Sequence, residues 1–206
     1  DPAVNQVIGI IFSLFVYIPP FVLIAKGFKY KISDIALFRK PEKGNRLTLF
    51  LIGISFCSFA NIAVNYAASI FKGFGIEYNV DFGENPKGIF GFLLSFIATA
   101  IVPAIVEEFA CRGIMLGLLK KYGEGFAIIA SSIIFGIMHG NFEQIPFATM
   151  VGLVFGYVYV KTGSIWASIL VHCANNAVAV IYSYLPNTIN VNITYIIFLA
   201  ISLLCS

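Results

Sequence analysis

The sequence predicts an all-α membrane protein, a bundle of seven to eight transmembrane helices forming a single domain over residues 1–206. Of the 206 residues, 59% are hydrophobic and 11% are charged, whereas soluble domains carry about 25% charged residues. Several apolar runs reach the roughly 20 residues that a helix needs to cross a hydrocarbon core of about 30 Å. Lipid offers no partners to backbone N–H and C=O groups, so spans of this kind are expected to be helical.

Seven apolar segments are predicted to cross the membrane. They cover approximately residues 4–25, 47–71, 88–119, 126–139, 145–160, 164–185 and 191–205. The third contains Pro103 and is long enough to tilt, to kink or to split into two helices, which would make eight. Two pairs with GxxxG spacing, Gly113/Gly117 and Gly152/Gly156, predict close helix packing without chemistry.

Basic residues predict the orientation in the membrane. One side collects most of them: Lys26, Lys29, Lys31, Arg39, Lys40, Lys43, Arg46, Lys120, Lys121 and Lys161. The positive-inside rule makes this side cytoplasmic, with the N-terminus outside and the C-terminus inside. We therefore expect a multi-pass protein of the plasma membrane. The chain begins with Asp1 rather than Met, which suggests processing, and its first apolar run shows no cleavage site and is expected to be retained.

Charge inside the third segment is the most informative feature of the chain. Glu107, Glu108 and Arg112 are the only charged residues between Gly88 and Leu119, and a charge at membrane depth is costly, so it is expected to be paired, hydrated or used. Glu108 and Arg112 are four residues apart, the favourable order for a helical ion pair. Glu107 points about 100° away and is left as a free carboxylate that can take or give a proton.

The two histidines of the chain also lie in apolar segments. His139 follows Phe135 by one helical turn, and His172 precedes Asn176 by one turn. At 1.5 Å per residue, these polar groups and Glu107 all lie roughly 12–20 Å from the cytoplasmic ends of their helices. They can therefore converge if the three helices pack together. A carboxylate and an imidazole can deprotonate a water, while a second imidazole and an amide N–H can donate to an oxyanion, which favours hydrolysis of an amide bond.

A metal site is the second interpretation of the same atoms. Glu107, His139 and His172 could hold zinc with an open position. The helical HExxH signature is absent, so we expect no cofactor, with zinc as the alternative.

Three short sequence motifs resemble those of the CPBP family of intramembrane proteases, which comprises the type II CAAX prenyl endopeptidases and their bacteriocin-processing relatives. They are Glu107-Glu108-x-x-x-Arg112, Phe135-x-x-x-His139 and His172-x-x-x-Asn176. All three occur in order on successive membrane segments, within a core of about residues 88–185. The first two segments carry no mark of the family.

The resemblance implies a glutamate-dependent intramembrane endopeptidase acting on a membrane-associated peptide or a lipidated protein. Glu107 matches the water-activating glutamate, assisted by His139, and His172 and Asn176 match the pair that stabilises the oxyanion. The residues in supporting positions are Glu108, Arg112 and Phe135. The family has long been labelled metallopeptidase. A bacterial chain has no prenylated CAAX substrate of its own, so the eukaryotic substrate class does not carry over directly.

Three further hypotheses stay open at this point. A thiol enzyme could use Cys111 or Cys173, although Cys111 next to two glutamates lacks the positive surroundings that a thiolate needs. A proton-coupled carrier also uses intramembrane acids and histidines, but no inverted repeat is visible. A non-enzymatic bacteriocin-immunity protein is the third. The modest net charge of +3 gives no reason to expect nucleic acid as a partner, and neither the substrate nor the oligomeric state follows from the sequence.

Overall fold

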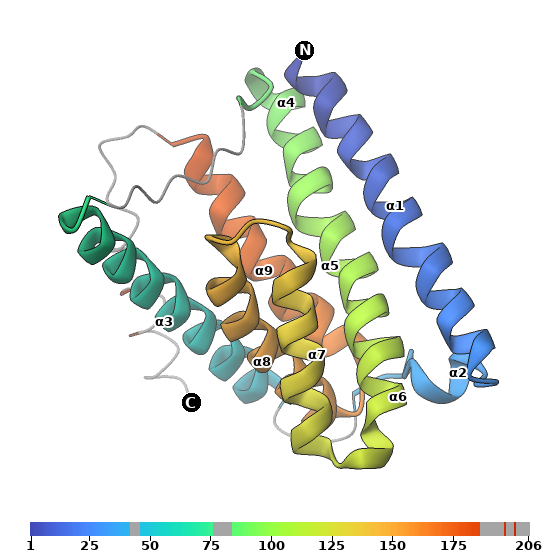
Figure 1. The fold of residues 1–206 in the computed structure, drawn as a ribbon. Coiled ribbons are helices and arrows are strands. Elements are labelled where there is room, and N and C mark those ends of the chain that lie inside the picture. Colours follow the sequence, from blue (N-terminus) through green and yellow to red (C-terminus); the bar gives the residue numbers. More distant parts are fainter. Residues whose placement is uncertain (42–45, 76–83, 186–195, 197–199, 201–206) are drawn as a thin grey trace.

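The computed structural model describes residues 1–41, 46–75, 84–185, 196 and 200, and throughout these ranges all regular structure is helical (Figure 1). The prediction of an all-α bundle is confirmed. The helices run in the order α1 (Pro2–Gly27), α2 (Ile32–Ile35), α3 (Arg46–Gly73), α4 (Gly88–Ser95), η1 (Phe96–Ile101), α5 (Val102–Glu108), η2 (Phe109–Leu116), α6 (Gly117–Leu119), η3 (Lys120–Tyr122), α7 (Glu124–Met138), α8 (Gln144–Thr162) and α9 (Ile165–Ser183).

Within these ranges, five helices are long and apolar enough to cross a membrane. They are α1, the part of α3 from Leu47, the continuous stretch Gly88–Tyr122, α8 and α9. Helix α7 has 15 residues and is about 22 Å long at 1.5 Å per residue, which is less than the hydrocarbon thickness. The last predicted segment, residues 191–205, lies outside the described residues. The predicted count of seven to eight spans is therefore not confirmed, whereas the multi-pass membrane character is.

The third predicted segment neither splits nor breaks. Elements α4 to η3 follow one another without interruption from Gly88 to Tyr122, and we call this stretch the central rod. It contains two π-helical stretches, η1 and η2. In the first, the N–H of Val102 donates to Ile97 O, five residues back. Pro103 follows immediately, and a proline has no N–H to donate to the carbonyl four residues before it.

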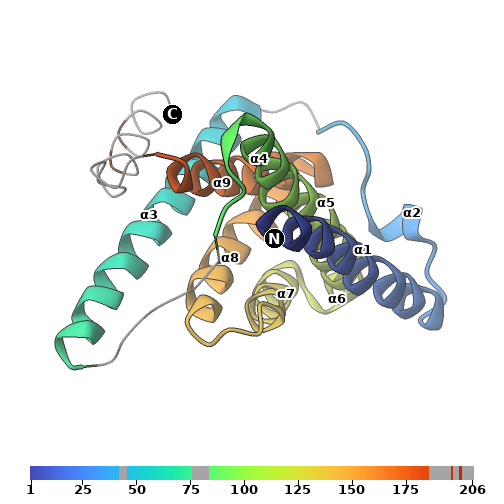
Figure 2. The same cartoon turned by 90° about the horizontal axis from the view of Figure 1, so that it is seen from above.

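The other helices surround the central rod (Figures 1 and 2). Helix α1 packs along the rod, α9 packs against η1 and α5, and α7 pairs with α8, which in turn contacts α3. Figure 2 shows α1 and α3 on opposite flanks of the bundle. The N-terminus lies at one end of the bundle, and α2 and α6 lie at the other (Figure 1). Many large apolar side chains remain exposed on outward faces, Phe12, Phe15 and Phe90 among them, as expected for a surface solvated by lipid.

Small residues allow the close contacts predicted from their spacing. A Cβ added at Gly113 would lie 2.9 Å from Ala36 Cβ, and one at Gly117 would lie 2.9 Å from Ile35 O, so both glycines admit the segment at α2. A Cβ at Gly152 would lie 3.2 Å from Ser132 Cβ. The predicted role of these glycines in helix packing is confirmed.

Candidate active site

A buried ion pair forms the base of the candidate site. Arg112 Nη1 donates to Glu108 Oε1 at 2.8 Å, and both side chains are 0% exposed. Arg112 Nη2 also donates to Gly152 O at 2.7 Å, and the guanidinium carbon lies 4.6 Å from the centre of the Phe135 ring and 5.3 Å from that of Phe155. The predicted pair is thus confirmed, and it ties the central rod to α7 and α8.

His172 of α9 contacts both carboxylates of the first motif. Its Nδ1 lies 3.0 Å from Glu108 Oε1, and its Nε2 lies 3.9 Å from Glu107 Oε2. The imidazole stacks on the Phe155 ring at 4.5 Å between centroids and meets Phe135 edge-on at 5.8 Å. A carboxylate only accepts hydrogen bonds, so Nδ1 carries the proton and Nε2 faces Glu107. Glu108 therefore does more than the structural pairing with Arg112 that the sequence indicated.

Glu107 is the more accessible of the two carboxylates. Its side chain is 12% exposed, against 0% for Glu108. In the described part of the chain it forms no hydrogen bond, and it lies within electrostatic range of His139 as well as His172. Tyr17 of α1 also interacts electrostatically with Glu107. This is the free carboxylate that the spacing of the motif predicts.

His139 caps the C-terminus of α7 and faces the same aromatic ring as His172. Its Nδ1 lies 2.9 Å from Phe135 O, and its ring packs edge-on against the Phe135 ring at 4.8 Å. A backbone carbonyl only accepts, so Nδ1 donates and Nε2 of the neutral ring keeps its lone pair. No direct bond joins His139 to Glu107 among the described residues.

Asn176 lies on α9, one turn after His172, and contacts η1 of the central rod. Its Nδ2 donates to Thr99 O at 3.1 Å, and its Oδ1 accepts from Asn175 Nδ2 at 3.2 Å. Asn176 lies one helical turn beyond His172 and is half-buried. The structure thus brings Glu107, Glu108, Arg112, Phe135, His139 and His172 into one cluster and holds Asn176 at its margin.

Sequence reasoning missed several contributors to this cluster. Phe155 stacks on His172, and no motif in the sequence indicates it. Tyr17 comes from α1, a segment with no recognisable signature, and is 9% exposed. Gly152 was noticed for its spacing alone, whereas its carbonyl accepts from Arg112. The contact with Gly152 could have been anticipated in part, because a buried arginine such as Arg112 needs more than one hydrogen-bond acceptor.

The three residues predicted as alternative zinc ligands do not form a metal site in the structure. Across residues 1–41, 46–75 and 84–185, no group of three or more His, Cys, Asp or Glu is placed to hold a metal ion. Glu107, His139 and His172 share the cluster but do not form such a group. The site residues therefore do not fit zinc in this arrangement.

The cysteines of the thiol hypothesis lie near the cluster without joining it. Cys111 is completely buried beside Arg112, and Cys173 is half-buried next to His172. In the described ranges neither sulfur is hydrogen-bonded to a histidine. The pairing of thiol with base that activates a nucleophilic cysteine is not formed here.

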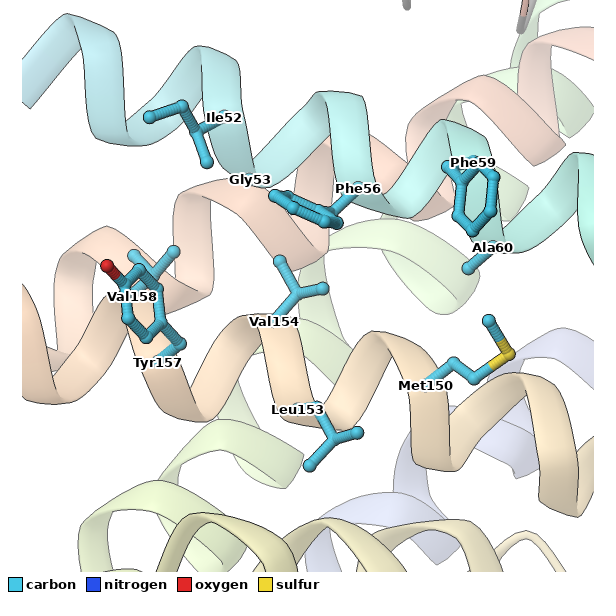
Figure 3. Close-up of a pocket in the computed structure, with 10 residues that line it drawn as sticks. All are labelled: Ile52, Gly53, Phe56, Phe59, Ala60, Met150, Leu153, Val154, Tyr157 and Val158. Carbon is cyan, nitrogen blue, oxygen red and sulfur yellow. The ribbon is translucent and has the colours of Figure 1, made fainter. Parts of the chain in front are cut away.

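Two cavities lie close to the site. An apolar groove of about 480 Å³ runs between α3 and α8, and Figure 3 shows Phe56 and Val154 pointing toward each other across it. A cavity of about 600 Å³ opens at the end of the bundle that carries Asp1 and Glu84, and it reaches Thr99. The second cavity has a polar lining and opens at the end of the bundle opposite α2 and α6.

The segment that builds the site matches a known family. The family model described as Type II CAAX prenyl endopeptidase Rce1-like matches residues 89–178, which include every predicted site residue. Residues 89–178, a little under half of the chain, are thus similar to this family. Helices α1 and α3 lie outside the match.

Two curated relatives are also similar to part of the chain. A protein of Bacillus subtilis (strain 168) named "Putative membrane peptidase YdiL" is 36% identical over 121 residues, which are 54% of this chain and 49% of that protein. The "Membrane-embedded CAAX protease MroQ" of Staphylococcus aureus (strain USA300) is 30% identical over 93 residues, 42% of this chain and 38% of the relative. The chain spans about half the length of the first relative and less of the second. No solved structure matches the chain.

Proposed function

We propose that this Rce1-like protein is an intramembrane endopeptidase that hydrolyses a peptide bond of a membrane-associated peptide or protein. The observation that carries the proposal is the position of His172 between Glu107 and Glu108, 3.9 and 3.0 Å from their carboxylate oxygens. Two acids and an imidazole buried together at membrane depth are costly unless they are used. The names of the two relatives, a membrane peptidase and a CAAX protease, point to the same chemistry.

Glu107 acts as the general base. A water bound between Glu107 and His139 Nε2 loses a proton to the carboxylate while its oxygen attacks the carbonyl carbon of the substrate. His139 accepts a hydrogen bond from this water, because its Nδ1–H is engaged with Phe135 O. The C–N bond then breaks, and Glu107 returns the proton to the leaving amine. One water is consumed, and the products are a carboxylate and an amine.

His172 and Asn176 stabilise the oxyanion. Because Nδ1–H of His172 is directed at Glu108, Nε2 can donate to the oxyanion only when the ring carries both protons. Asn176 uses one N–H of its amide for Thr99 O and has the second available for substrate. Preorganised donors of this kind stabilise a tetrahedral intermediate at no cost of reorganisation.

No metal takes part in these steps, since the described His, Cys, Asp and Glu residues form no group of three placed to hold one. A peptide or lipidated protein reaches the site from the bilayer between helices. The positive-inside rule places the N-terminus outside and the basic turns in the cytoplasm. With this orientation, the cavity that reaches Thr99 admits water from the outer face.

The test is cleavage of a library of quenched fluorogenic peptides by the purified protein in liposomes, with the new peptide ends identified by mass spectrometry. Glu107→Ala and His139→Ala are expected to abolish cleavage while the protein still folds. Glu124→Ala is the matched control, because among the described residues Glu124 forms an exposed ion pair with Lys120 and no contact with the site. Full activity in either site variant would overturn the catalytic assignment.

A further inference from the structure

A chain of side-chain amides links three elements at the margin of the site. Asn61 Nδ2 of α3 donates to Asn175 Oδ1 at 3.1 Å, and Asn175 Nδ2 of α9 donates to Asn176 Oδ1 at 3.2 Å. Asn176 Nδ2 then donates to Thr99 O of η1 at 3.1 Å. Asn61 is anchored on its own helix, because its Nδ2 also donates to Cys57 O at 2.8 Å.

Both ends of this chain are backbone carbonyl oxygens, which can only accept. Rotating any one amide by 180° would set two acceptors or two donors against each other. Rotation of Asn176 in particular would bring its Oδ1 against Thr99 O. The chain therefore has one favourable arrangement, in which the NH₂ group of Asn176 faces the rod and its oxygen faces Asn175.

Pro103 explains why Thr99 O is available for this contact. In a regular helix the carbonyl of residue 99 accepts from the N–H of residue 103. Residue 103 is proline and has no N–H, and Asn176 supplies the missing donor from another helix. The proline thus removes the α-helical donor of Thr99 O, and this carbonyl accepts from a side chain of the candidate oxyanion site.

We propose that Asn61, Asn175 and Pro103 are positioning residues that hold the amide of Asn176 with its second N–H free for the oxyanion. This inference rests on the proposed function. It extends the catalytic apparatus to α3, which lies outside the segment that matches the family. The free N–H is the only polar group of Asn176 without a partner in the described part of the chain.

The decisive variant is Pro103→Ala. It returns an N–H to residue 103, which then competes with Asn176 for Thr99 O, so kcat is expected to fall about tenfold with little change in KM. The rod itself is expected to hold or gain thermal stability, because a helix-interior proline is replaced by a strong helix former. Pro146→Ala in the first turn of α8 is the matched control and is expected to keep wild-type kcat.

Double variants separate positioning from general damage. Asn176→Ala alone is expected to lower kcat by about 10²–10³, the usual loss for one oxyanion donor. Asn175→Ala and Asn61→Ala are each expected to lower kcat about tenfold. If they act through Asn176, then neither they nor Pro103→Ala will lower kcat further in the Asn176→Ala background.

The outcomes distinguish this inference from the function on which it rests. Wild-type kcat in Pro103→Ala and Asn175→Ala, together with a loss in Asn176→Ala, would overturn the positioning chain and leave the oxyanion role intact. Multiplicative losses in the double variants would overturn it too. Wild-type kcat in Asn176→Ala would instead contradict the oxyanion role in the proposed function.

Discussion

The carboxylate of Glu108 and the imidazole of His172 meet at 3.0 Å, with side-chain exposures of 0% and 4%. The same oxygen, Oε1, accepts from Arg112 at 2.8 Å. One carboxylate oxygen therefore fixes both a buried cation and the ring orientation of a histidine from another helix. The second carboxylate of the motif, Glu107, is left to face the opposite ring nitrogen.

Loss of the Glu108 charge is expected to lower stability more than loss of the Glu107 charge. Glu108→Gln leaves the guanidinium of Arg112 buried without a counter-charge, and breaking a buried ion pair in this way costs about 3–5 kcal/mol. Glu107→Gln breaks no hydrogen bond among the described residues and is expected to cost less than about 1 kcal/mol. Thermal unfolding of the two variants in detergent measures the difference. Equal losses would contradict the division of roles.

Gly152 is expected to be intolerant of a methyl group. A Cβ there would lie 3.1 Å from Phe135 Cδ1 and 3.2 Å from Arg112 Nη2, so Gly152→Ala must displace the ring or the guanidinium. Overpacking of this kind typically costs about 1–3 kcal/mol. Gly125→Ala in α7 is the control, since a Cβ there has no neighbour within 4 Å. Comparable unfolding temperatures for both variants would show that the packing of Gly152 against Phe135 and Arg112 tolerates a methyl group.

The cysteines are expected to be dispensable for cleavage. Cys111 is buried and Cys173 half-buried, and neither bonds to a described histidine. Cys111→Ala and Cys173→Ser should each keep kcat within about threefold of the parent protein, in line with small changes away from the reacting atoms. Abolished cleavage in either variant, in a preparation with unchanged thermal unfolding, would support the thiol mechanism instead.

Chelation is expected to leave cleavage unchanged. Glu107, His139 and His172 form no group placed to hold a metal ion, and the proposed water activation uses the carboxylate and the imidazole alone. The measurement is the cleavage rate after dialysis against a chelator, with and without added zinc. A loss of activity that zinc restores would establish the metalloprotease alternative.

Residue spacing within a single helix predicted those contacts of the site that lie within one helix. The Glu108–Arg112 pair follows from i,i+4 spacing, and the isolation of Glu107 follows from the 100° rotation per residue. The contact of His172 with Glu108 depends on how α9 is set against the central rod, which no single-helix pattern contains. The amide chain from Asn61 to Thr99 requires three elements at once and was not predicted.

The remaining differences also have physical causes. The apolar segment predicted at residues 126–139 forms α7, Glu124–Met138, but its 15 residues are too few to count as a membrane span by length. The third segment keeps its continuity past Pro103 because a π-helical stretch precedes the proline and Asn176 satisfies Thr99 O. The sequence showed the proline but not the donor that compensates for it.

The central claim is that Glu107 removes the proton from the attacking water, and Glu107→Gln tests it most directly. The substitution keeps the shape of the side chain and removes its basicity, while Glu108, Arg112 and His172 keep their contacts. We predict a fall in kcat of about 10²–10⁴, the range typical of a lost general base, with little change in thermal unfolding. Cleavage at the wild-type rate by Glu107→Gln would contradict the account.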